Sequence, residues 1–173
     1  MKERAILYSE KQRFRQWWIW VLILPTPMVC LWGMFQQIIL GVPFGNAPAN
    51  DLFLILIAVV FGLGLPLFIY KAGLDTEVTD REVRIRFRPI HRDWVRYDFD
   101  QIENVQVHIY NPIRDYGGWG IRYGRLGKAY NVSGNAGVLV TLKNGTRVLI
   151  GSGLHEILSG IIFDQMERCS NNT

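Results

Sequence analysis

The chain has 173 residues, of which 20% are charged, and it carries a net charge of +4 at pH 7. This length allows one modest domain plus a membrane anchor, and so small a net charge argues against the dense basic face that nucleic-acid-binding proteins usually need. The two cysteines, Cys30 and Cys169, offer no disulfide framework and no zinc spacing, which fits a reducing compartment.

Residues 1–16 form a short basic segment. It carries five Lys and Arg residues against Glu3 and Glu10, and a long apolar run follows it directly. Basic residues beside a membrane span tend to stay in the cytoplasm. We therefore expect a cytoplasmic segment that anchors and orients the first helix.

Residues 17–71 predict a hairpin of two transmembrane helices. The runs from Trp17 to Leu40 and from Leu52 to Tyr70 contain no charged residue. Each meets the length of roughly 20 apolar residues that a helix needs to cross a bilayer. Prolines and glycines within both runs predict bends.

The flanks of these runs predict the orientation. The loop 41–50 contains neither Lys nor Arg, so the positive-inside rule places both termini in the cytoplasm of a bacterial inner membrane. The expected interface anchors are basic or aromatic: Arg13, Arg15, Trp17, Trp18, Trp20, Tyr70 and Lys71. Cleavage as a signal peptide near Ala47-Pro48-Ala49 is the alternative, but the apolar core is too long and the cut too late.

Residues 72–169 predict a mainly β domain. Val83, Ile85 and Phe87 alternate with arginines, which is typical of a strand with one apolar and one charged face. Further strands are expected at 74–79, 93–98, 102–110, 119–123, 128–132, 136–143 and 146–151. Asn144-Gly145 predicts a tight hairpin between the last two, and Asn111-Pro112 predicts a turn.

An amphipathic helix is expected to close the domain. Ser152 or Gly153 can cap it. An apolar stripe then recurs at helical spacing, and polar residues including Gln165 are expected to face away; the stripe consists of Leu154, Ile157, Leu158, Ile161, Ile162 and Met166. Such a helix must cover an apolar surface, for which the open side of the sheet is suited. Residues 170–173 are a polar tail.

Two apolar spans followed by a mainly β domain with a closing helix resemble the bacterial membrane-anchored PH-like (pleckstrin-homology-like) domain proteins. The stretches that carry the resemblance are Val78-Thr79-Asp80, Val83-Arg84-Ile85, Ile102 to Val105, Tyr110-Asn111-Pro112, Gly117 to Arg122, Ala129 to Gly134 and Gly137 to Ser152. The resemblance implies a curved antiparallel sheet, or partly open barrel, of about seven strands with a C-terminal helix. It implies scaffolding or binding at membranes and transfers no catalytic residues.

Arg84, Arg86 and Arg88 form an arginine stripe shortly after the second apolar run. Anionic headgroups attract such residues by about 1 kcal/mol each, so the stripe is a candidate lipid or partner site. The favoured alternative is a solvated strand face whose charges are balanced by acidic neighbours in the sequence, namely Asp80, Glu82, Asp93 and Asp98.

A glycine-rich stretch, 117–127, contains Trp119, Arg122 and Arg125. It lacks the spacing of a phosphate-binding loop and does not lead into a helix. Turns and a bulge in a curved sheet are the favoured explanation. The alternative is a mobile loop that presents Trp119 to a partner or to the lipid interface, with Arg122 and Arg125 as further candidate binding residues.

No combination of residues indicates a reaction. His91, His108 and His155 lie far apart without a Cys or Glu at ligand spacing, and Asp98 and Asp100 suit a turn better than acid catalysis. We expect no cofactor, no metal and no nucleic acid.

The favoured function is a non-enzymatic scaffold or recruitment module at the cytoplasmic membrane surface. Its expected partners are membrane lipids and other membrane proteins or a second copy of the chain. An accessory subunit of a larger membrane complex and an anionic-lipid-binding module are the alternatives.

Overall fold

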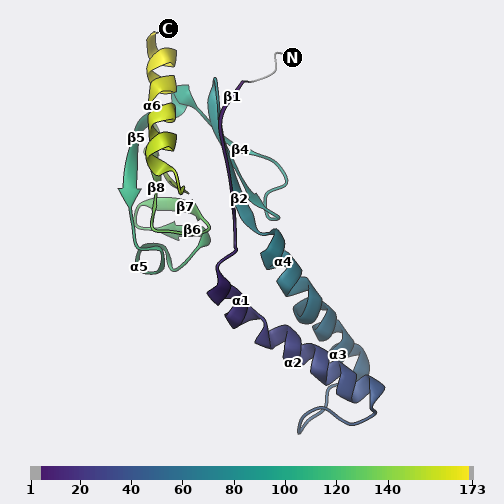
Figure 1. Cartoon of the computed structure of the whole chain (residues 1–173). Coiled ribbons are helices and arrows are strands. Elements are labelled where there is room, and N and C mark those ends of the chain that lie inside the picture. The colour runs from purple at the N-terminus through teal and green to yellow at the C-terminus, as the bar shows by residue number, and fades with distance from the viewer. Residues whose placement is uncertain (1–4, 172–173) are drawn as a thin grey trace. The chain divides into compact units, whose positions relative to one another are not determined.

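The structure, a computed structural model that describes residues 5–171, divides the chain into two units (Figure 1). The helical unit is Phe14–Ala72. The β-rich unit joins the N-terminal strand to the chain from Gly73 onward. The predicted 1–16 segment is therefore not a separate element, because most of it belongs to the β-rich unit.

The helical unit contains two helices that are long and apolar enough to cross a membrane, Trp17–Ile39 and Asp51–Lys71. The first comprises α1 (Trp17–Ile23), α2 (Pro25–Met34) and a π-helical segment, η1 (Phe35–Ile39). The second comprises α3 (Asp51–Ile57), a π-helical segment, η2 (Ala58–Gly64), and α4 (Leu65–Lys71). Both predicted spans thus exist as helices.

Gln37 organises the connection between the two helices. Its Nε2 donates to the Ala49 carbonyl at 2.8 Å and to Asp51 Oδ1 at 2.7 Å, while its Oε1 accepts from the Phe44 N–H at 3.3 Å. Asn50 caps the second helix by accepting from the Phe53 N–H at 2.8 Å. These bonds satisfy polar groups that the end of an apolar helix would otherwise leave unpaired.

The first sheet has the order β1-β2-β3-β4 and is antiparallel throughout. Its strands are β1 (Ile6–Arg13), β2 (Gly73–Thr79), β3 (Glu82–Arg88) and β4 (Val95–Asp98). The sequence pattern does not predict strand β1, because this strand lies at the edge of the sheet and its only buried residue is Tyr8. Its basic residues resemble a topology signal, whereas in the structure they alternate along a strand.

The second sheet has the order β5-β8-β9-β7-β6. Its strands are β5 (Ile102–Ile109), β6 (Gly120–Gly124), β7 (Gly127–Asn131), β8 (Ala136–Leu142) and β9 (Arg147–Gly151). The β8–β9 hairpin is confirmed at Asn144-Gly145, where Gly145 has a φ of 81°. Strands β7 and β9 pair in parallel, so two sheets with one parallel pair replace the expected antiparallel sheet of about seven strands.

Two helices complete the β-rich unit. At the predicted Asn111-Pro112 turn a short helix, α5 (Pro112–Tyr116), begins, with Asn111 Oδ1 accepting from the N–H groups of Ile113 and Arg114. Helix α6 (His155–Asn171) packs against β5 and β8 and extends into the predicted 170–173 tail. Residues 172–173 lie outside the described part.

Helix α6 confirms only part of its predicted stripe. Leu158 and Ile162 are fully buried, and Ser152 Oγ accepts from the Leu154 N–H at 3.0 Å as the predicted cap. Leu154 and Ile157 are exposed, whereas Gln165 is buried. The buried face is therefore rotated toward Gln165 relative to the prediction, because only the residues that meet the sheets lose their solvent contact.

Strand β3 separates its two faces as predicted. Val83, Ile85 and Phe87 are buried together with Leu74 and Val78 of β2. The arginines between them point to the opposite face, which is the polar face of the first sheet. That face carries the candidate site.

Candidate functional site

The polar face of the first sheet gathers charged residues from all four strands. Directly opposed residues in neighbouring strands share a face. The register places Lys11 opposite Asp75 and Asp75 opposite Arg86. Among the described residues of strands β1–β4, this face therefore holds six cationic residues (Lys11, Arg13, Arg84, Arg86, Arg88 and Arg96) and four acidic residues (Asp75, Glu77, Glu82 and Asp98). Cations exceed carboxylates by two.

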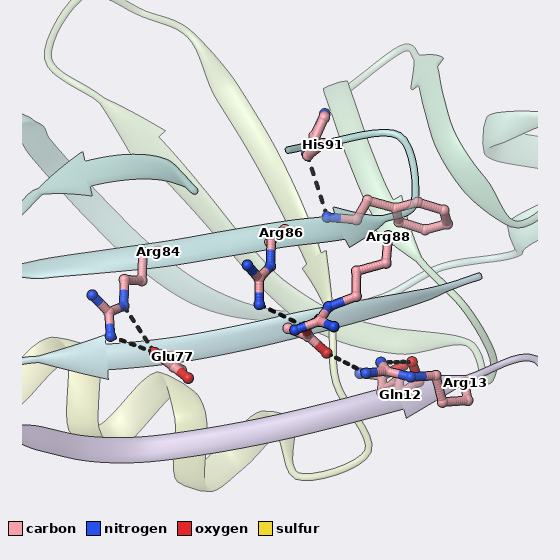
Figure 2. Close-up of polar contacts among 9 residues, drawn as sticks. Gln12, Arg13, Glu77, Arg84, Arg86, Arg88 and His91 are labelled. Atoms are coloured by element: carbon pink, nitrogen blue, oxygen red, sulfur yellow. Dashed lines mark hydrogen bonds and ion pairs between the residues drawn. The ribbon is translucent and has the colours of Figure 1, made fainter. Parts of the chain in front are cut away.

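Asp75 lies at the centre of this face with a side chain that is only 2% exposed. Its Oδ1 is 2.7 Å from Arg13 Nη2, and its Oδ2 is 2.7 Å from Arg88 Nε and 3.5 Å from Arg86 Nη2. Figure 2 shows the three guanidinium groups converging from β1 and β3. Burial alone would raise the pKa of Asp75, but Arg13 and Arg88 outweigh it and hold the pKa below its ordinary value.

The neighbouring arginines are fixed by a second carboxylate and an indole. Arg84 contacts Glu77 Oε2 at 2.8 Å through Nε and at 2.6 Å through Nη2 (Figure 2). The Trp94 ring centroid lies 4.9 Å from Arg84 Cζ and 4.5 Å from Arg86 Cζ, within the range of cation–π attraction. Arg86 Nε is buried and has no hydrogen-bond partner among residues 5–171.

The prediction of which acidic residues neutralise the arginine stripe is wrong. Asp75 and Glu77, which lie directly opposite on β2, neutralise these arginines. Of the acidic residues expected to do so, Glu82 pairs with Arg96 instead, at 3.8 Å. The reason is geometric: directly opposed side chains on adjacent strands lie about 5 Å apart, and the register places Asp75 and Glu77 opposite the arginines, whereas it places Glu82 opposite Asp98.

Arg13 was predicted to be a membrane-interface anchor, but its guanidinium is bound to Asp75 within the sheet. Its side chain crosses over Gly73, where an added Cβ would lie 2.6 Å from Arg13 Cδ and would collide with the Gln12 carbonyl oxygen. The remaining predicted anchors lie in or beside the helical unit: Arg15, Trp17, Trp18, Trp20, Tyr70 and Lys71. Trp17 is 76% exposed and Tyr70 is 71% exposed.

Substituting Gly73→Ala is expected to displace Arg13 and lower the free energy of unfolding by about 1–3 kcal/mol, the usual cost of overpacking. Thermal or urea unfolding of the full chain measures the loss. Gly160→Ala is the control, because nothing lies within 4 Å of that Cβ position in α6, and alanine there should stabilise the helix. Equal stability of the Gly73→Ala variant and the parent would contradict the close packing.

Trp119 lies just before β6, Arg122 lies in β6, and Arg125 lies in the turn between β6 and β7, so none of the three joins the arginine stripe of the first sheet. Trp119 Nε1 donates to the Gly134 carbonyl at 3.2 Å, and Arg122 Nε donates to the Trp119 carbonyl at 3.1 Å. These bonds hold Trp119 against the loop after β7, which disfavours its presentation by a mobile loop. Positive φ angles at Gly117 and Gly118 fit the predicted turn before β6, whereas Gly120 and Gly127, which also have positive φ angles, are the first residues of β6 and β7.

A second cluster, absent from the sequence-based expectations, forms around Lys128. Its Nζ lies 4.8 Å from the Tyr130 ring centroid and 5.6 Å from that of Tyr123. The His91 ring packs edge-on against Tyr130 with 5.7 Å between centroids, and burial lowers the pKa of His91, as does the nearby Lys128. Burial and the neighbouring Tyr130 raise the pKa of Tyr97. One feature of the sequence could have pointed to this cluster: Tyr123 and Lys128 lie opposite each other in the β6–β7 hairpin.

A family model matches residues 1–166, which span both units. The chain belongs to DUF6141, a family of unknown function. Comparison with curated proteins finds no match to this DUF6141 chain. Within residues 5–171, no three His, Cys, Asp or Glu side chains are grouped so that they could hold a metal ion.

Proposed function

We propose that this DUF6141 chain is a non-catalytic scaffold whose helical hairpin spans the inner membrane and whose PH-like, β-rich unit recruits a protein at the cytoplasmic surface. The observation that carries the proposal is the way in which the chain connects the two units. Only Phe14–Gln16 separate β1 from α1, and only Ala72 separates α4 from β2. Links this short reach at most about 15 Å, so anchored helices would keep the sheets beside the membrane.

Tethering suits a module whose individual contacts are weak. A surface held beside its partner experiences an effective concentration in about the millimolar range, so a modest interface suffices for recruitment. The polar face of the first sheet offers exposed cations at Arg88 and Arg96, whose side chains are 47% and 54% exposed. We propose an acidic protein surface as the partner of that face.

The proposed orientation of the hairpin in the membrane follows from the positions of the Lys and Arg residues that flank it. Arg15 and Lys71 flank the two apolar helices, while the loop 41–50 contains no Lys or Arg. Positive charge is retained on the cytoplasmic side, so both ends of the chain are proposed to lie there.

Membrane insertion and recruitment are tested together in intact membranes. The chain is expected to resist carbonate extraction, and a reporter fused after Thr173 should be active in the cytoplasm. A photoreactive residue at position 96 is expected to give a discrete protein adduct that Arg88→Glu weakens, whereas the same probe at Asp164 of α6 should not. Extraction by carbonate would overturn the anchor, and adducts insensitive to Arg88→Glu would overturn recruitment through this face.

A second candidate, contact with anionic lipid, is favoured by the excess of two cations on the same face. Each basic residue near an anionic surface gains about 1 kcal/mol. In nanodiscs, phosphatidylglycerol should slow hydrogen exchange at residues 89–96 relative to phosphatidylcholine, and added salt should abolish the difference. Identical exchange in the two lipids would exclude this candidate.

A further inference from the structure

A cavity of about 580 Å³ opens at the end of the second sheet, between the turn that joins β6 to β7 and the turn that joins β8 to β9. Its polar and aromatic lining comprises Tyr97, Tyr123, Arg125, Lys128, Thr146 and Arg147. This volume lies within the range of small-molecule sites in proteins, about 300–1,000 Å³. It exceeds what an inorganic anion alone would fill.

The charge of this cavity is unbalanced. Arg125, Lys128 and Arg147 line it, and none of the lining residues in the described part of the chain is acidic. Within residues 5–171 no carboxylate forms an ion pair with any of these three cations. The polar face of the first sheet differs, because carboxylates there pair with the arginines. Three gathered cations repel one another unless an anion joins them.

The backbone and the tyrosine rings hold the cations at this cavity. Gly127 has a φ of 98°, and a Cβ there would collide with the Arg147 carbonyl oxygen, so the β6–β7 turn packs directly against the start of β9. Lys128 lies against the rings of Tyr123 and Tyr130. Burial alone would lower the pKa of Lys128, but hydrogen bonding to Tyr130 and the nearby Tyr123 raise it, which keeps the ammonium charged at neutral pH.

We propose that this cavity binds a phosphate monoester, with Arg125, Lys128 and Arg147 holding the phosphate and the rings of Tyr97 and Tyr123 contacting the esterified group. A dianionic phosphate matches an excess of cations better than a carboxylate does, and guanidinium groups bind its oxygens in a bidentate manner. The remaining volume of the cavity accommodates an organic substituent. The phosphate is either that of a soluble ester or that of a lipid headgroup, since both present the same group.

The test uses the full chain and two matched probes. Glycerol 3-phosphate is titrated calorimetrically into the protein in dodecylmaltoside micelles. Phosphatidic acid, which carries the same monoester, is supplied in phosphatidylcholine nanodiscs, and its retention is measured by native mass spectrometry. Methyl sulfate, a monoanion, serves as the ligand control.

Arg125→Gln and Arg147→Gln are each expected to weaken binding by about tenfold or more, as loss of a charged hydrogen-bond partner does. Lys143→Gln is the matched control, because Lys143 lies in the same β8–β9 turn but lines a different cavity. Both arginines are exposed, so thermal unfolding of their variants should match that of the parent. Binding in micelles assigns a soluble ester, and retention of phosphatidic acid alone assigns a headgroup.

The proposal is overturned if neither probe binds saturably, if methyl sulfate binds as tightly as glycerol 3-phosphate, or if Lys143→Gln weakens binding as much as the arginine variants. The micelle titration does not require the hairpin to cross a membrane or the first sheet to bind a protein. Failure of the proposed scaffold function is therefore distinguishable from failure of this site.

Discussion

Asp75→Asn is expected to lower the free energy of unfolding of the β-rich unit by about 3 kcal/mol, as breaking a buried ion pair does. Arg13, Arg86 and Arg88 all contact this one carboxylate, whose side chain is 2% exposed. An amide keeps the shape but removes the negative charge, so three guanidinium groups would repel one another without compensation. Urea unfolding of the full chain in micelles measures the difference.

The control for Asp75→Asn is Asp80→Asn, because Asp80 is exposed after the end of β2. That variant should stay within about 0.5 kcal/mol of the parent, as most surface substitutions do. Equal stability of the two variants would contradict a central role for Asp75.

The pH dependence of the free energy of unfolding is a second test of the role of Asp75. Because the folded-state pKa of Asp75 lies below its ordinary value of 3.8, its ion pairs stabilise the fold above that pH. This contribution is lost as the pH falls through the lower folded-state pKa. The stability difference between the parent and Asp75→Asn should therefore shrink on acidification below pH 3.8. A difference that stays constant in acid would show that the variant acts through packing.

The sequence was most informative where a strand has one buried face. Val83, Ile85 and Phe87 are all buried, and the arginines between them face away, as the period-two pattern predicts. The two apolar helices were predicted equally well, because an uncharged apolar run of about 20 residues is typical of a membrane-spanning helix and of few other structures. Strand β1 carries no such signal, since its polar residues occupy both faces of an edge strand.

The side-chain pairs that form between neighbouring strands could not be predicted from the sequence. The partners of Arg84 and Arg88 depend on the β2–β3 register, which a strand pattern alone leaves open. The contact between Arg13 and Asp75 depends in addition on β1 joining the sheet from beyond the helical hairpin. The cavity lined by Lys128 combines turns from two hairpins with Tyr97 of the other sheet, so the pairing of Tyr123 with Lys128 in one hairpin could not have indicated the cavity as a whole.

Glu10 joins β1 to the start of α6 through one carboxylate. Its Oε2 accepts from Ser152 Oγ at 2.6 Å and from the Tyr8 hydroxyl at 2.8 Å. Its Oε1 accepts from the Gly153 N–H at 3.0 Å and from Gln12 Nε2 at 3.1 Å. Burial raises the pKa of Tyr8 to about 12, with Glu10 beside it, so this hydroxyl stays protonated and able to donate. Through these bonds an edge strand that buries little apolar surface is held to the residues that directly precede α6.

Glu10→Ala is expected to cost about 3 kcal/mol, because hydrogen bonds to charged groups contribute about 1.5–3 kcal/mol each and several donors lose their acceptor together. The loss should be local: hydrogen exchange is expected to accelerate across Ile6–Arg13 and Ser152–Leu158, while β8 keeps its protection. Ser9→Ala, a change at an exposed neighbour on the same strand, is the matched control and should leave exchange unchanged. Because the strand that leads into α1 is also the strand that Glu10 holds, freeing it should additionally loosen the chain before Trp17. Protection of β1 that survives Glu10→Ala would mean that backbone pairing with β2 alone is enough to hold the strand.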